Sequence, residues 1–231
     1  MIQNIVTFIL VIIPIILIMW YINERDNKEK EPLILIVIMI LLGIISVCLS
    51  RWVWKLIIIN IPEIKEEIAS RDWYVRILIS YGQIGFIEET IKYIILNILI
   101  YRNKNYDYMY DGIVYSVALS LGFALMEGIE YGMKTNLIVS LVRSILTIPM
   151  HTVYGVMMGY YMSKGKIDNN NRVMYYRYVG LILPIFIHGT SDYMLSILNS
   201  NNQLIYIGWA IFLYIGSLKK INELSKFDKK I

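Results

Sequence analysis

The sequence has a single cysteine and few charged residues for its length. Cys48 is the only cysteine in 231 residues, so the chain has no partner for an internal disulfide or for a thiolate metal site. Charged residues make up 17% of the composition against 57% hydrophobic residues, and the mean hydropathy is +0.56. This balance excludes the soluble globular class and predicts an integral membrane protein. The net charge of +4 needs no nucleic acid to explain it, and we expect no such partner.

The first apolar run also lacks the marks of a secretory signal. No basic segment leads into it, no small-residue cleavage site ends it, and its first cations, Arg25, Lys28 and Lys30, follow it. We therefore expect it to be kept as a first membrane span.

Seven stretches are long and apolar enough to cross a bilayer, which takes about 20 residues per helix. No linker separates a soluble domain and no internal repeat divides the chain, so we expect one integral membrane domain over residues 1–231. Arg51 and Lys55 interrupt the second stretch, so residues 51–61 either extend its helix or lie in the membrane interface. The predicted fold is an all-α polytopic membrane helix bundle, with spans at about 3–22, 33–59, 75–101, 110–131, 136–162, 176–199 and 203–218.

The distribution of Lys and Arg over the loops predicts the orientation of the bundle. With seven spans, one side collects fourteen of these cations and the other at most six. Because cations concentrate in cytosolic loops, we expect the N-terminus outside and the C-terminus in the cytosol of a bacterial cell.

Ionisable side chains lie inside these apolar stretches, where their cost marks a functional site. Lys92 follows Glu88 by four residues and Glu89 by three, so it can neutralise either glutamate, and adjacent glutamates point about 100° apart on a helix. His188 and Asp192 share a helix face, so the carboxylate can orient the imidazole. Counted along the helices, Glu88, His151 and His188 reach mid-bilayer, while Glu127 and Asp192 lie closer to the outer face. The candidate site residues are Glu88, Glu89, Lys92, Glu127, His151, His188 and Asp192. Arg143 has no assigned role.

Four motifs also carry a resemblance. In chain order they are Glu88-Glu89-x-x-Lys92, Asp111-Gly-Ile-Val-Tyr with Gly122-Phe123-x-x-x-Glu127, His151 with Tyr154-Gly155, and His188-Gly-x-x-Asp192. Together they resemble the PrsW family of bacterial intramembrane proteases, which is distantly similar to the CAAX prenyl-protease group. The resemblance implies a catalytic core at about 75–199. It also implies first-site cleavage, on the extracytoplasmic side, of a single-span membrane protein such as an anti-sigma factor.

Peptide hydrolysis needs an activated water, a stabilised oxyanion and a proton donor. By analogy with the CAAX group, Glu88 is expected to activate the water, with Glu89 and Lys92 balancing charge. His151 and His188 are expected to position the water or stabilise the oxyanion, Asp192 to orient His188, and Glu127 to act as a second acid or a ligand.

Two routes to this hydrolysis stay open. The sequence has no HExxH zinc motif that would settle the choice, and we favour a mechanism without a cofactor. The alternative is a zinc-dependent protease with ligands drawn from Glu89, Glu127, His151 and His188. A different class, a proton-coupled transporter, also uses buried acids and histidines, but such carriers commonly have repeated halves and this sequence shows none.

Overall fold

The described part of the chain is almost entirely helical. The computed structural model describes residues 2–61, 72–168, 172–198 and 202–231. Within these ranges it contains no strand, and its only β-type pairing is an isolated antiparallel bridge between Tyr108 and Lys230. The predicted all-α bundle is confirmed.

The helices correspond to the seven expected stretches. Residues 51–60 continue α2, so the interruption by Arg51 and Lys55 does not end that helix. The segments α4, η1 and α5 follow one another without a break and form a single rod. By length and composition, α1, α2, α6, α7 and α9 qualify as membrane spans among the described residues. In chain order the elements are α1 (Ile2–Glu24), α2 (Leu33–Asn60), α4 (Trp73–Ile77), η1 (Leu78–Glu88), α5 (Glu89–Leu99), α6 (Asp111–Lys134), α7 (Leu137–Ile167), α8 (Val173–Ile197) and α9 (Gln203–Lys226).

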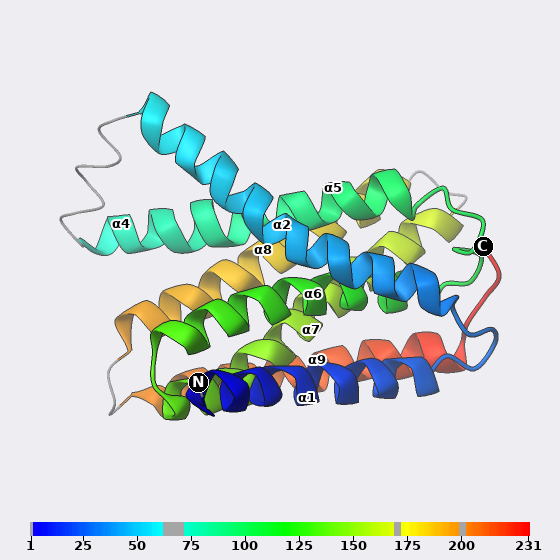
Figure 1. The fold of residues 1–231 in the computed structure, drawn as a ribbon. Helices are drawn as coiled ribbons and strands as arrows, with labels where there is room; N and C mark the ends of the chain where they lie inside the picture. The colour runs from blue at the N-terminus through cyan, green and yellow to red at the C-terminus, as the bar shows by residue number, and fades with distance from the viewer. Residues whose placement is uncertain (1, 62–71, 169–171, 199–201) are drawn as a thin grey trace.

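Helix α6 lies at the centre of the bundle (Figure 1). Helices α1, α2 and α7 pack against it, and every residue from Asp111 to Ala124 is buried. The outer faces of α1, α2 and α9 instead expose Ile, Leu, Phe and Trp side chains. An apolar surface of this extent suits contact with lipid rather than with water.

Glycines bring the neighbouring helices unusually close to α6. A Cβ atom added to Gly122 would lie 2.0 Å from the carbonyl oxygen of Ile40 in α2. On the other side, a Cβ on Gly159 of α7 would lie 2.1 Å from the carbonyl oxygen of Gly112. Small residues permit such backbone contact between membrane helices. This close packing fixes α2, α6 and α7 relative to one another around the site described below.

The segment η1 is a π-helix, which the sequence did not predict. It spans Leu78–Glu88 and ends where the α-helical turn of α5 begins at Glu89. Gly85 on this segment packs against Gly189 of α8, with a virtual Cβ 3.3 Å from the Gly189 Cα. Segments of π-helix are rare and often occur at functional sites.

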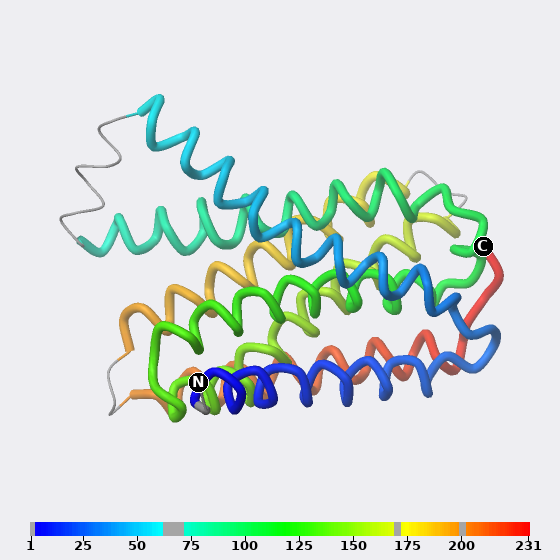
Figure 2. Tube along the Cα trace, viewed as in Figure 1, coloured from blue at the N-terminus to red at the C-terminus, as the bar shows by residue number. Residues whose placement is uncertain are grey.

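The two termini lie at opposite ends of the bundle (Figure 2). The side-chain amide of Gln3 donates a hydrogen bond to the carbonyl of Thr135, which joins the N-terminal end of α1 to the end of α6. At the other end, Met109 and Lys229 are joined by a main-chain hydrogen bond of 3.0 Å. Termini on opposite sides are what an odd number of crossings requires, while the direction of insertion stays a prediction.

Candidate functional site

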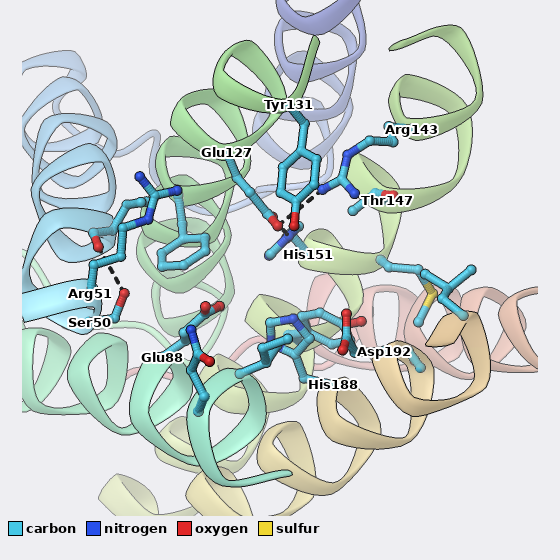
Figure 3. A pocket seen from close by; sticks show the side chains of 18 of the residues that line it. Ser50, Arg51, Glu88, Glu127, Tyr131, Arg143, Thr147, His151, His188 and Asp192 are labelled. Atoms are coloured by element: carbon cyan, nitrogen blue, oxygen red, sulfur yellow. Dashed lines mark hydrogen bonds and ion pairs between the residues drawn. The ribbon is translucent and has the colours of Figure 1, made fainter. Parts of the chain in front are cut away.

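A cavity of about 140 Å³ lies among η1, α2, α6, α7 and α8 (Figure 3). Helices far apart in the sequence each contribute polar side chains to its wall. Five of the seven residues expected at the site line it: Glu88, Glu127, His151, His188 and Asp192.

The two adjacent glutamates have different surroundings. Glu88 faces the cavity and its carboxylate makes no hydrogen bond or ion pair with any described residue. Glu89 does not line the cavity and is 0% exposed, as is Lys92, whose Nζ lies 2.6 Å from Glu89 Oε1. The Lys92 ammonium also lies 4.3 Å from the centre of the Phe123 ring. The π-helix ends at Glu88 and the α-helix begins at Glu89, and the two side chains have different neighbours, as their spacing on a helix predicts.

Glu89 also holds one of the two imidazoles. His188 Nδ1 lies 2.7 Å from Glu89 Oε1, so a carboxylate on α5 fixes the ring of a histidine on α8. The spacing predicts that Asp192 orients His188, but the structure has no hydrogen bond between these two residues. Asp192 instead accepts a hydrogen bond of 3.0 Å from the Ser80 hydroxyl. Residues four apart on one helix can meet, but here a partner on a neighbouring helix comes closer to the ring.

The second imidazole has a matching support. His151 Nε2 lies 3.0 Å from Glu127 Oε2, and the guanidinium of Arg143 lies 3.0 Å from Glu127 Oε1. His151 is 1% exposed, and its Nδ1 atom is buried without a hydrogen-bond partner among the described residues. Each histidine is thus held by a carboxylate, and each carboxylate by a cation.

Aromatic contacts fix the rings further. The centres of the His151 and His188 rings are 5.3 Å apart. Tyr154 stacks on His188 at 4.4 Å, and Phe123 lies 5.5 Å from His151. Carboxylates and aromatic neighbours together leave the two imidazoles little freedom to rotate.

Three contributors to the site were missed or left without a role by the sequence analysis. Arg143 is one, although an arginine inside an apolar stretch is itself a signal of function. Ser80 is another, and a serine at that position carries no signal. The third is the π-helical geometry of η1, which apolar periodicity does not reveal.

Comparison with known sequences agrees with this geometry. The model of the PrsW family intramembrane metalloproteases matches residues 31–217, which include every segment that lines the cavity. The chain belongs to the PrsW family. It is therefore a membrane protease, and its apolar helices make it a multi-pass protein of the bacterial cell membrane.

Curated relatives extend the match over most of the chain. Protease PrsW of Clostridioides difficile (strain 630) is 32% identical over 97% of this chain and 93% of its own length. Protease PrsW of Bacillus subtilis (strain 168) is 30% identical, with 92% of each chain covered. Protease PrsW of Oceanobacillus iheyensis is 31% identical over 92% of this chain and 94% of its own length. No solved structure matches.

The cavity of this PrsW family member contains donors that a catalytic zinc ion uses. Imidazole nitrogens and carboxylate oxygens are the usual ligands, and a carboxylate on the far ring nitrogen commonly orients a ligating histidine. In the Glu89–His188 and Glu127–His151 pairs a carboxylate holds one ring nitrogen of the histidine in this way. The buried Nδ1 of His151 has no hydrogen-bond partner among the described residues, so it can serve as a metal ligand. Within the described residues, however, no three donor atoms of this set lie within 4.8 Å of one another. The donor chemistry fits zinc, and side-chain movement is needed to close a ligand shell.

Proposed function

We propose that this cavity hydrolyses a peptide bond of a membrane-anchored protein, with Glu88 activating the attacking water. The observation that carries the proposal is the contrast among the carboxylates. Glu89, Glu127 and Asp192 are each held by a hydrogen bond or ion pair, whereas Glu88 faces the cavity without such a partner. A general base needs a carboxylate free to accept a proton from water.

The other residues then have supporting roles. Glu89 and Lys92 form a buried pair of opposite charge that holds His188 by its Nδ1. Glu127, itself paired with Arg143, holds His151 in the same way. Two imidazoles fixed beside one cavity can position water and stabilise charge on the substrate carbonyl oxygen.

Zinc dependence is the more favourable of the two routes once the family is known. The family is described as a metalloprotease, and the two carboxylate-held histidines suit a zinc ligand set. We propose that His151 and His188 hold the ion together with a cavity carboxylate, and that Glu127 and Glu89 orient the two rings from their other nitrogens. Glu89 and Glu127 are poorer ligand candidates than the sequence indicated, because each already contacts a cation and a histidine. When bound, zinc lowers the pKa of water and polarises a carbonyl.

The substrate we propose is a single-span protein such as an anti-sigma factor, cleaved on the extracytoplasmic side. The position of the cavity supports this side. Glu127 lies seven residues before the end of α6, at the end of the bundle that Gln3 and Thr135 join to the N-terminus. In the orientation that the Lys and Arg distribution predicts, this end faces outward.

The decisive experiment uses the full chain reconstituted in liposomes with a tagged single-span substrate. Cleavage by the native sequence and by Glu24→Gln, an exposed residue at the far end of α1, is expected. Loss of cleavage in Glu88→Gln, with the protein still folded, supports the assignment. Full cleavage by Glu88→Gln would end it, and no cleavage of any candidate by the native chain would argue against the proposed substrate class.

A further inference from the structure

A second group of acidic side chains lies far from the catalytic cavity. Asp26 and Glu31 come from the connection between α1 and α2, and Asp111 is the first residue of α6. One carboxylate oxygen from each lies within 4.8 Å of the others. Glu127 is sixteen residues further along α6, so this acidic group lies about 24 Å from that part of the cavity.

All three carboxylates are removed from solvent. The exposed fractions are 2% for Asp26, 7% for Glu31 and 0% for Asp111. Gathering like charges in a buried place is costly unless a counter-charge is present. A fourth carboxylate, Asp228 near the C-terminus, is also buried and adds to the negative potential at Asp26.

No described cation forms an ion pair with these three carboxylates, although the charge of Lys30 favours the ionised form of Asp26. No described donor meets hydrogen-bond geometry at either carboxylate oxygen of Asp26 or at Asp111 Oδ1, although the main-chain N–H groups of Lys28 and Glu29 lie near Asp26. Lys30 is near, but its ammonium donates to the main-chain carbonyls of Asn23 and Asp26 rather than to a carboxylate. Completely buried oxygens without donors are uncommon in native proteins and call for an explanation such as a bound ion.

The oxygens are also held in place. Asp111 Oδ2 accepts the main-chain N–H groups of Asp107 at 3.0 Å and Tyr108 at 2.7 Å, while Glu31 Oε2 accepts the hydroxyl of Tyr115. The site is thus a set of acceptors held in place, with no described cation paired to them.

We propose that Asp26, Glu31 and Asp111 bind a hard divalent cation of the Mg²⁺ or Ca²⁺ class. An all-oxygen ligand set selects such ions over zinc, which favours nitrogen and sulfur. The ion joins the α1–α2 connection to the start of α6. The C-terminal segment meets the same place, because the Tyr110 N–H donates to Asp228 Oδ1 at 2.9 Å. The ion therefore stabilises the end of the bundle and takes no part in the cleavage.

The test is thermal unfolding of the purified full chain in detergent after chelation. Adding Mg²⁺, Ca²⁺ or Mn²⁺ is expected to raise the Tm saturably, by about 5 °C or more at a hundredfold excess over the Kd. Asp26→Asn and Asp111→Asn are expected to lose this shift. Glu29→Gln, an exposed acid on the same connection, is the matched control and keeps it.

Two further measurements keep the test independent of the catalytic cavity and of misfolding. The double variant His151→Ala, His188→Ala keeps the cation-dependent shift, because those rings lie at the other site. For the native chain, paramagnetic resonance of titrated Mn²⁺ is expected to show one tight ion that Mg²⁺ or Ca²⁺ displaces. An unchanged Tm with all three cations and no tightly bound Mn²⁺ overturns the proposal, and so does a full shift in Asp26→Asn.

Discussion

The Nδ1 atom of His188 lies 2.7 Å from Oε1 of Glu89, the same oxygen that Lys92 approaches to 2.6 Å. One buried oxygen therefore ties α5 to α8 and connects a charge pair with an imidazole at the cavity. Removing Glu89 affects both stability and the site, and the two effects can be separated.

Glu89→Gln leaves the Lys92 ammonium buried without its counter-charge. Breaking a buried pair in this way costs about 3–5 kcal/mol. Glu89→Gln combined with Lys92→Met removes both charges and is expected to recover most of the stability but no cleavage. The measurement is thermal unfolding alongside substrate cleavage. Recovery of cleavage in the double variant would show that Glu89 has only a structural role.

Glu88→Gln is expected to behave in the opposite way. Because the carboxylate of Glu88 has no hydrogen bond or ion pair with the described residues, its loss changes the Tm little. Cleavage is expected to fall by about 10²–10⁴-fold, the usual contribution of a general base. A large fall in Tm would instead indicate a structural role for this side chain.

Because the chain has only two histidines, the hydrogen bonds of their rings can be measured by NMR. With ¹⁵N-labelled histidine only His151 and His188 contribute signals, and a variant of either assigns them. Glu89→Gln is expected to shift the His188 ring nitrogens, whereas Asp192→Asn leaves its tautomer unchanged because Asp192 bonds to Ser80. The reverse pattern would restore Asp192 as the partner of His188.

Zinc dependence predicts about one zinc ion per active chain by elemental analysis. His151→Ala with His188→Ala is expected to reduce the zinc content to background, while Asp26→Asn leaves it unchanged because Asp26 lies at the other site. Strong chelation is expected to stop cleavage and added zinc to restore it. Undiminished cleavage by metal-free protein would return the mechanism to the unassisted glutamate route.

Helix contact provides a test away from the chemistry. In Gly122→Ala the new methyl group meets the Ile40 carbonyl at 2.0 Å, so α2 and α6 must move apart. The expected loss of stability is about 1–3 kcal/mol or more. Gly208→Ala is the control, because nothing lies within 4 Å of its virtual Cβ and alanine favours a helix. Equal Tm values for both variants would contradict the close packing.

The sequence predicts the helices well because most are long apolar runs, and it singles out candidate site residues because ionisable groups are rare in such runs. Partners across helices are harder to predict. Spacing along one helix pairs His188 with Asp192, but the packing of α8 against the rod that carries Glu89 brings a different carboxylate to the ring. The sequence marks Asp111 as a possible helix cap and motif residue, but it does not group it with Asp26 and Glu31, because these residues lie at the ends of spans, where charge is ordinary.

Helix α2 has a further consequence for the enzyme in its native surroundings. Its 28 residues measure about 42 Å, whereas the hydrocarbon layer is about 30 Å thick. A helix this long must tilt or protrude, by an amount that depends on the lipids around it. Ser50 and Arg51 on α2 form part of the cavity wall, so the acyl-chain length of the membrane acts directly on the shape of the site.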